Sequence, residues 1–364
     1  MKKNVSLLIC TALIAAMVTG CGSSDSSSKS EADSSSTSAV STEATTVSET
    51  EVSTTESDTE NKEVNEQYSA VTIENFDLTT EYTEKPSAVI TLTLNSAEII
   101  AALGESDSII GIAANNNVVE DVLPEYYDSL SKCDFPEAIN SGIPTLEGIL
   151  GLSPDMMVLN SYYFNVPVFG TADDYKGNNI NLYVPEGSYV KNGTIDNTYN
   201  DIRNLGMIFG KEDKAEEIIS DMKARVDAVS DKVSGKDKVK VMAFDSTNED
   251  MLNVAGGTGL EQSLIELAGG ENIFSDVDKQ FGAVSYEEII SRDPEVIIIH
   301  EYTNDDTDAQ TKLDLLKNSP DLANVSAVKN DRIIIVPLFS INPGLQNADF
   351  VEKLAKELHS EAFE

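Results

Sequence analysis

The longest regular pattern of apolar residues lies in the middle of the chain, between Gly210 and Val233. Apolar residues recur there at intervals of three and four, the spacing of one helix face; they are Ala215, Ile218, Ile219, Met222, Val226, Val229 and Val233. Charged residues fill the opposite face, and Gly235 follows as a stop signal. At ~1.5 Å per residue, such a helix spans roughly 35 Å. We therefore predict one long helix that joins two lobes.

Short apolar runs alternate with amphipathic segments on both sides of this helix. Before it, the pattern predicts strands at 88–94, 109–113, 156–159 and 181–184, with helices at 97–103, 145–152 and 197–209. After it, strands are expected at 238–244, 296–299 and 332–336, with helices at 260–268, 285–291, 313–318 and 348–358. This alternation is typical of an α/β fold, here two lobes that each hold a mainly parallel sheet with flanking helices.

One unit occurs twice, because residues 144–158 align without a gap with residues 284–298. Each copy has a hydroxyl residue at the expected helix start, a Glu two positions later, and then Pro, an acidic residue and a buried strand. In the second copy, Ser285 and Glu288 have the spacing of a capping box, which leaves Glu287 free. Glu287 then corresponds to Glu147. The repeat indicates two lobes related by duplication.

The N-terminal residues do not belong to this fold. Lys2 and Lys3 precede an apolar run at 5–18, which is too short to span a bilayer and is typical of a signal peptide at 1–21. The run ends in Val-Thr-Gly-Cys, which resembles the lipobox of bacterial lipoproteins, so Cys21 is the expected lipidation site. The alternative is an ordinary signal peptide with a chance Cys. Residues 22–67 are rich in Ser, Thr and acids and are expected to form a disordered tether.

Charge and cysteine content narrow the function further. The formal net charge is −38, and removing the signal segment and the tether still leaves −31 on the folded part. A surface this acidic repels nucleic acid and anionic lipid headgroups, so we exclude nucleic-acid binding. Of the three cysteines only Cys133 remains after processing and lipidation at Cys21, so no intramolecular disulfide is expected. We interpret Cys133 as structural.

Several segments resemble one family. They are the paired units, the helix start Gly210-Lys-Glu-Asp-Lys-Ala-Glu-Glu, the run Leu267-Ala-Gly-Gly-Glu-Asn and the run Ala327-Val-Lys-Asn-Asp-Arg-Ile-Ile-Ile-Val-Pro. Together they resemble the iron-complex and cobalamin class of ABC-importer substrate-binding proteins, from about Ala88 to the end of the chain. The resemblance implies an N-terminal lobe at 68–209, an interlobe helix at 210–235 and a C-terminal lobe at 236–364.

The resemblance also implies the function. Such a protein is a lipid-anchored, extracytoplasmic monomer that holds a metal chelate between its lobes and delivers it to an ABC permease and its ATPase. It performs no chemistry and keeps no permanent cofactor; the transported ligand is expected to be an Fe(III) chelate. Glu147 and Glu287 match the positions at which family members place permease-docking carboxylates. The other interpretation is that each Glu only complements a helix N-terminus.

The ligand is expected at the carboxyl ends of the parallel strands, where strand-to-helix loops meet. His300 ends an apolar strand beside Tyr302 and is a candidate metal ligand for ferric iron or haem; the alternative is an ordinary hydrogen-bonded His. Aromatic and amide side chains at these ends suit a bulky, partly polar ligand. The candidates are Asn95, Asn115, Tyr162, Tyr163 and Tyr189 in the first lobe, and Asp245, Thr258, His300, Tyr302, Phe339 and Asn342 in the second.

None of the four arginines falls in an expected cleft loop, although Lys176 or Lys191 remains available as a cation. Family members that take trianionic ferric catecholates generally surround them with Arg and Lys. We therefore expect a neutral or cationic ligand, with a ferric siderophore first, a corrinoid second and haem third. A surface sensor or adhesin without a permease is a different class that stays open. A hydrolase is disfavoured, because the chain lacks the Gly-x-Ser-x-Gly and His-Glu-x-x-His motifs.

Overall fold

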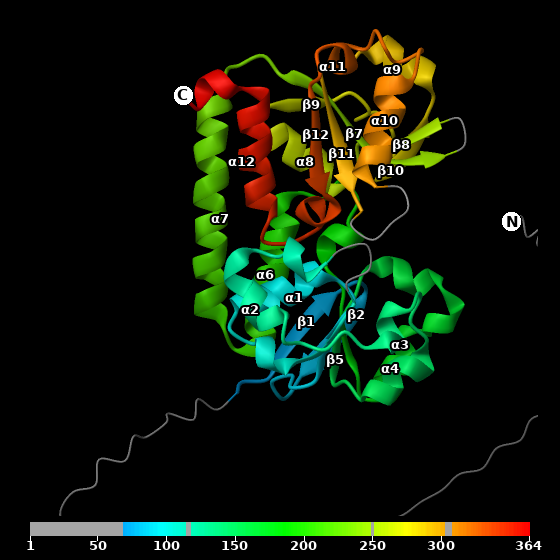
Figure 1. Cartoon of the computed structure of the whole chain (residues 1–364). Coiled ribbons are helices and arrows are strands. Elements are labelled where there is room, and N and C mark those ends of the chain that lie inside the picture. The colour runs from blue at the N-terminus through cyan, green and yellow to red at the C-terminus, as the bar shows by residue number, and fades with distance from the viewer. Residues whose placement is uncertain (1–67, 114–117, 249–250, 303–307) are drawn as a thin grey trace, which may run out of the picture. The chain divides into compact units, whose positions relative to one another are not determined.

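The computed structural model describes residues 68–113, 118–248, 251–302 and 308–364. It contains one large sheet before the long helix and another after it (Figure 1). The first sheet has four parallel strands in the order β4-β3-β5-β6. These strands are almost entirely buried, as expected for a parallel sheet between helices. Their bounds are β3 Val89–Thr91, β4 Ile109–Ile112, β5 Met156–Val158 and β6 Asn181–Tyr183.

Six helices accompany this sheet. The last of them, Ile195–Phe209, packs closely against the interlobe helix that follows it. A Cβ added to its Gly206 would lie only 2.5 Å from the Cβ of Ala215 in the interlobe helix. The Ile195–Phe209 helix ends at Gly210, whose φ of +64° is the left-handed conformation of a helix stop. The six are α1 Leu94–Ala102, α2 Pro124–Leu130, α3 Glu137–Asn140, α4 Leu146–Leu152, α5 Ala172–Gly177 and α6 Ile195–Phe209.

The predicted interlobe helix is α7, Glu212–Val233, and Figure 1 shows it running alongside both lobes. Its buried residues are Ala215, Ile219, Met222, Val226 and Val229, which all belong to the predicted apolar face. Arg225 fastens the helix to the C-terminal helix α12, Asn347–Leu358, through ion pairs of 2.8 Å to Asp349 and 2.9 Å to Glu352. The prediction of one long helix between two lobes is confirmed.

The second sheet has six strands and is mixed rather than wholly parallel. Its path is β10-β8-β7-β11-β12, and β9 also pairs with β7. β7, β9, β11 and β12 are parallel, whereas β8 is antiparallel to both of its neighbours, β7 and β10. β8, β9 and β10 were not predicted. The strands are β7 Val239–Asn248, β8 Met251–Ala255, β9 Gly270–Asn272, β10 Phe281–Val284, β11 Val296–Glu301 and β12 Ile333–Pro337. The helices are α8 Leu260–Leu267, α9 Tyr286–Arg292, α10 Ala309–Asn318, α11 Ser326–Lys329 and α12.

The sequence repeat is also a structural repeat. Helices α4 and α9 begin after Thr145 and Ser285 and end at Ser153 and Asp293, and both end residues have a positive φ. Each N-cap hydroxyl accepts a backbone N–H three residues later, at 3.1 Å from Gly148 and 3.2 Å from Glu288. The Ser285 N–H donates in return to Glu288 Oε2 at 2.9 Å, so the predicted capping box is confirmed.

The acidic residue of each repeat also makes the same connection. The Asp155 N–H donates to the carbonyl of Ala88 at 2.9 Å, and the Glu295 N–H donates to the carbonyl of Lys240 at the same distance. In return, the Asp155 and Glu295 carboxylates each accept the backbone N–H of that same partner at 3.0 Å. The strand pairs β3–β5 and β7–β11 therefore have equivalent registers in the two lobes.

A two-stranded hairpin precedes the first sheet and was not predicted. β1, Val71–Asn75, pairs with β2, Leu78–Tyr82, across a two-residue turn of Phe76 and Asp77. Their φ values are +52° and +57°, which suits the turn geometry that best matches strand twist but is normally taken by Asn or Gly. A left-handed conformation costs an L-residue roughly 1–2 kcal/mol. The tip of this hairpin is therefore strained.

In the described part of the chain, no helix combines the length and the apolarity needed to cross a membrane. The predicted signal peptide, with Cys21, and the predicted tether fall at 1–67, outside the described residues.

Candidate functional site

A pocket of about 440 Å³ lies at the carboxyl ends of the strands of the first sheet and is closed on one side by the second lobe. Thr93 follows β3, Ala113 follows β4 and Asn160 follows β5, which is the position at which open α/β sheets bind ligands. None of the described residues that line it is charged. They are Leu92, Thr93, Asn95, Ala113, Gly142, Ile143, Asn160, Tyr162 and Tyr163 from the first lobe, and Leu338 and Asn342 from the second.

Four of the predicted ligand-binding residues meet in this pocket: Asn95, Tyr162, Tyr163 and Asn342. Tyr162 is the most open of the aromatic rings, with 51% of its surface exposed, and it contacts the buried ring of Tyr163 at 4.5 Å between centroids. A large ring exposed in a concave site is ready to stack on a ligand. Thr93, Ile143, Asn160 and Leu338 were missed, although Asn160 follows a buried strand and so satisfies the rule used for the others.

Asn95 holds the two lobes together. Its side chain is only 2% exposed, and its Nδ2 donates to the carbonyl of Phe339 in the second lobe at 2.8 Å. Phe339 itself has no exposed surface, so its ring packs in the core rather than in the pocket. Asn95 therefore lines the pocket and is fixed by this interlobe hydrogen bond, whereas Phe339 does not reach the pocket.

Two further candidates, Tyr189 and Thr258, lie in a smaller interlobe pocket of about 160 Å³. The Tyr189 hydroxyl accepts hydrogen bonds from Phe76 N at 3.1 Å and Asn75 Nδ2 at 3.3 Å, so the hairpin holds this ring in place. The Thr258 carbonyl accepts the backbone N–H of Asn192 at 2.9 Å, which ties the two lobes at this point.

The lobes meet tightly beside this smaller pocket. A Cβ added to Gly187 would lie 2.5 Å from Cγ of Pro343, so only glycine permits this approach of the two chains. Lys191, a candidate cation for the ligand, forms a 2.6 Å ion pair with Asp278 of the second lobe. Lys176, the other candidate, lines a groove between β2 and α5, away from the 440 Å³ pocket.

The remaining candidates, Asp245, His300 and Tyr302, form a hydrogen-bonded cluster inside the second lobe. His300 is completely buried, with Nδ1 3.2 Å from Asp245 Oδ1 and Nε2 2.9 Å from Glu261 Oε1. The Tyr302 hydroxyl donates to the same Asp245 oxygen at 2.6 Å. Both ring nitrogens of His300 therefore already face carboxylates.

The electrostatics of the cluster agree with a protonated His300. Burial lowers the pKa of its imidazole, but the adjacent Glu261 and Asp245 carboxylates outweigh burial and raise this pKa to about 9. Burial likewise opposes ionisation of Asp245, yet bonds from His300 and Tyr302 hold its pKa below the usual value. A doubly donating imidazolium has no lone pair for a metal. The geometry thus favours the hydrogen-bonded interpretation of His300 over the metal-ligand one.

Metal coordination has no other centre in the described residues. Among them, no group of three or more His, Cys, Asp and Glu side chains is arranged to hold a metal ion. Asn115, also predicted to contact ligand, lies at 114–117, outside the described residues.

Comparison with known proteins identifies the architecture. Residues 89–338 match the family model described as periplasmic binding protein. The chain belongs to the periplasmic binding protein family. It is 25% identical over 240 residues to the vitamin B12-binding protein of Vibrio campbellii, an alignment that covers 62% of this chain and 76% of that relative.

Solved structures give the same result for the fold. A periplasmic binding protein from Veillonella parvula superposes with a TM-score of 0.70 at 25% identity, covering 80% of this chain and 98% of that one. An ABC-type Fe3+-hydroxamate transport system from Saccharomonospora viridis gives 0.65 at 22% identity, covering 79% and 98%. The two-lobed α/β fold of this periplasmic binding protein is therefore shared with both.

The two predicted docking carboxylates of this periplasmic binding protein occupy matched positions. Glu147 and Glu287 are both exposed in the first turns of α4 and α9. Within the described ranges neither side chain makes a hydrogen bond or an ion pair, whereas the Glu288 carboxylate accepts the hydrogen bonds of the capping box. In Figure 1 both helices lie toward the side away from α7.

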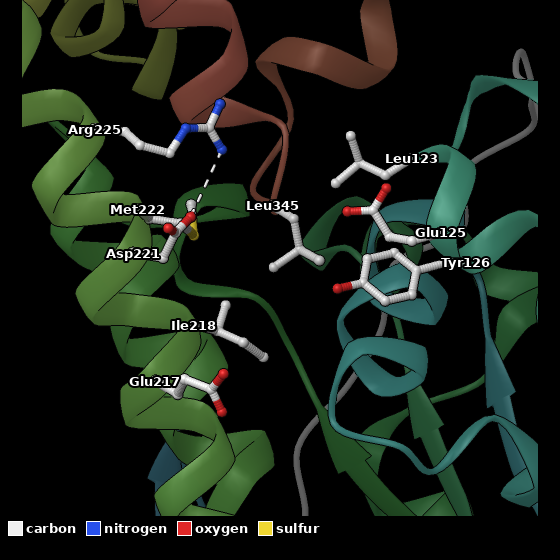
Figure 2. A pocket seen from close by; sticks show the side chains of 9 residues that line it. All are labelled: Leu123, Glu125, Tyr126, Glu217, Ile218, Asp221, Met222, Arg225 and Leu345. Carbon is white, nitrogen blue, oxygen red and sulfur yellow. Dashed lines mark ion pairs between the residues drawn. The ribbon is translucent and has the colours of Figure 1, made fainter.

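A separate groove of about 320 Å³ lies between α7 and α2 and has the opposite character (Figure 2). Its apolar floor includes Ile218, Met222 and Leu345, but Glu217 and Asp221 on α7 face Glu125 on α2 across it. Arg225, the cation at its edge, is already paired with Asp349 and Glu352. None of the predicted ligand-binding residues lines this groove, whereas four of them line the uncharged pocket at the strand ends.

Proposed function

We propose that this periplasmic binding protein captures a metal chelate without net negative charge in the 440 Å³ pocket and delivers it to an ABC permease. The observation that carries the proposal is the uncharged lining, which offers amide, hydroxyl and aromatic groups in a chain of net charge −38. An anionic ligand buried there would have no cation to compensate its lost hydration, and the acidic domain would repel it during approach.

Two chelate classes fit this description equally well. A corrinoid is supported by the relative from Vibrio campbellii, whose name says that it binds vitamin B12. A ferric hydroxamate is supported by the name of the Saccharomonospora viridis structure. Both cyanocobalamin and ferrichrome are neutral, and both present amides that suit Asn160 and Asn342. Haem fits less well, because its two propionates would require cations in the pocket.

Delivery rests on Glu147 and Glu287. Each carboxylate stands on the rigid start of a helix, one in each lobe, and is free to accept a bidentate contact from an Arg of the permease. Capture itself involves no covalent step. We further propose lipid attachment at Cys21, where two acyl chains at ~0.8 kcal/mol per buried methylene would hold the protein to a membrane. Residues 22–67 would then act as a tether.

A ligand panel tests the proposal directly. The chain has no Trp, so tyrosine emission can be followed while the full chain is titrated with cyanocobalamin, ferrichrome, a ferric catecholate and haemin, with correction for ligand absorption. We expect saturable quenching at submicromolar concentration by cyanocobalamin or ferrichrome only. Saturation by the ferric catecholate alone would overturn the proposal, because a trianionic ligand needs cations that this pocket lacks.

A variant locates the binding. Tyr162→Ala removes the exposed ring of the pocket and should weaken binding by roughly tenfold, as expected for one stacked aromatic contact. Glu125→Gln, in the groove between α7 and α2, is the control and should leave affinity unchanged. Equal effects of both variants would place the ligand elsewhere.

A further inference from the structure

A series of touching aromatic rings runs from the N-terminal hairpin to the ligand pocket. The ring of Phe76, at the hairpin tip, stacks on Phe164 with centroids 5.1 Å apart and an interplanar angle of 15°. Phe164 belongs to the same short 3-10 helix, Ser161–Asn165, as the pocket residues Tyr162 and Tyr163. One ring of the hairpin therefore packs on the element that presents the exposed Tyr162.

Further ring contacts fix this helix from behind. Phe169 contacts Phe164 edge-on at 6.0 Å and contacts Tyr163 at 5.1 Å, and Phe169 has no exposed surface. Tyr163 in turn contacts Tyr162 at 4.5 Å. Aromatic pairs at these separations have preferred relative orientations, so the position of one ring constrains the next.

The hairpin tip also contacts Tyr189, which lines the smaller interlobe pocket. Phe76 contacts the ring of Tyr189 edge-on at 5.0 Å, and its backbone N–H donates to the Tyr189 hydroxyl. The adjacent Asn75 is buried and pairs its side-chain amide with both backbone groups of Val184, at 2.7 and 2.9 Å. Ser188 completes the connection, because its carbonyl accepts the Ser161 hydroxyl at 2.9 Å.

Phe76 has a backbone conformation that a bulky residue rarely adopts. A bulky residue with a φ of +52° is a genuine outlier, and such strain persists only where surrounding contacts over-determine it. Asn or Gly would form this turn without strain. The hairpin lies before residue 89, where the family match begins, and Phe76 does not line the pocket.

We infer that Phe76 is a positioning residue for the ligand pocket: its ring holds the Ser161–Asn165 helix and Tyr189, and so sets how firmly Tyr162 and Tyr163 are presented. The inference rests on the proposed function for its effect on affinity. It predicts that the identity of residue 76 controls ligand affinity although this residue does not touch the ligand.

The substitution Phe76→Asn separates this role from a merely structural one. Asn relieves the strained turn but removes the ring, so stability to urea should be kept while affinity falls. In the full chain, we expect binding of cyanocobalamin or ferrichrome, whichever the wild type takes up, to weaken by roughly three- to tenfold. Phe76→Tyr keeps the ring and should restore wild-type affinity. An unchanged affinity in Phe76→Asn would overturn the inference.

A matched control addresses general destabilisation. Phe350→Leu removes a buried ring from α12, far along the chain from the hairpin, and should lower stability while leaving affinity unchanged. If Phe350→Leu weakened binding as much as Phe76→Asn does, affinity would be following stability and the positioning role would be refuted.

A second readout needs no ligand and therefore separates failure of the inference from failure of the proposed function. Because the chain has no Trp, Tyr162→Trp introduces a single reporter at the exposed position. In this background, Phe76→Asn should lower the steady-state anisotropy of the indole and raise its quenching by acrylamide, roughly twofold for a loosened ring. Phe76→Tyr and Phe350→Leu should leave both unchanged. If no chelate binds, the proposed function fails, and an unaltered indole signal in Phe76→Asn would refute the inference as well.

Discussion

Three positions at the strand ends are equivalent in the two lobes and carry different chemistry. By the register of the repeat, Thr93, Asn160 and Tyr162 of the first lobe correspond to Asp245, His300 and Tyr302 of the second. The first set lines the 440 Å³ pocket, whereas the second forms the buried cluster completed by Glu261.

The difference shows how one scaffold serves two purposes. Uncharged groups at strand ends can stay open to solvent and remain available to a ligand. Ionisable groups at the same depth must find partners, because an unpaired buried charge is costly. We therefore expect the first lobe to carry most of the recognition surface, while the second lobe uses these polar groups to hold its own core.

The largest expected effect comes from giving the second lobe the side chain of the first. His300→Asn removes the cation between Asp245 and Glu261 and should lower the free energy of unfolding by about 3–5 kcal/mol, the usual cost of breaking a buried pair. Urea denaturation measures this change. Asn160→Ala, at the matched position, should change stability by less than ~1 kcal/mol but weaken ligand binding. Equal losses of stability would contradict the assigned difference between the lobes.

The docking positions, by contrast, should behave alike in both lobes. Charge reversal of Glu147 and Glu287 together should reduce uptake of the bound chelate by at least ~100-fold, since each lost charge pair costs several kcal/mol at an interface. Either single reversal should act in the same direction. Ligand affinity of the isolated protein should not change. Normal uptake by the double variant would instead favour a role limited to the helix N-termini.

Smaller effects are expected from substitutions of Tyr162 and Tyr302, which the repeat places in equivalent positions. Tyr302→Phe removes the hydroxyl that donates to Asp245 and should cost about 1 kcal/mol of stability, with ligand affinity unchanged. It is the counterpart of Tyr162→Ala, for which affinity should fall and stability should hold. Parallel titrations and urea curves decide between them; a ligand effect of Tyr302→Phe would add the second lobe to the recognition surface.

Both lobes contain buried groups with a raised pKa, and we expect each of them to make the free energy of unfolding depend on pH. Burial raises the pKa of Glu98, in the first lobe, to about 7, and the carboxylates around His300 raise its pKa to about 9. Burial also raises the pKa of Asp201 to about 8. Each raised pKa gives stability that is present below the unfolded-state value and is lost as pH rises through the folded-state value.

The free energy of unfolding should thus fall between about pH 5 and 9, by up to ~1.4 kcal/mol per pH unit for each proton released. Glu98→Gln should flatten the curve below about pH 7, and His300→Asn should flatten it between about pH 6.5 and 9. Stability measured by urea denaturation across this range is the test. A curve that rises with pH would show that the raised pKa values are wrong in sign.

Much of this architecture was predictable from the spacing of apolar residues. The interlobe helix, the repeat and the capping box at Ser285 all depend on contacts within a few residues of the chain, which sequence patterns record directly. The hairpin escaped prediction because its turn uses Phe and Asp instead of the Asn-Gly or Asp-Gly pair that signals such turns. The antiparallel pair of β8 and β10 was missed because α8 and β9 lie between the two strands in sequence, so no hairpin turn signals the pairing.

The strand-end rule led to the uncharged pocket, but it could not give the direction of the side chains around that pocket. The strand-end rule selected Asn95, Tyr162 and Tyr163, which line the pocket, and also His300, which does not. The partners of His300 lie 55 and 39 residues away in sequence, so no local pattern shows that both of its nitrogens are occupied. Hydrogen bonds between residues far apart in sequence therefore decide which candidate side chains remain exposed in the pocket.

The salt dependence of ligand affinity shows whether binding in the 440 Å³ pocket depends on charge. Between about 0.01 M and 1 M salt the screening length falls from ~30 Å to ~3 Å, so any affinity that rests on charge must change strongly. For cyanocobalamin or ferrichrome in the 440 Å³ pocket, we expect a Kd that stays within about twofold over this range, because the described lining is uncharged. A Kd that rises steeply with salt, or tight binding of an anionic chelate, would contradict it.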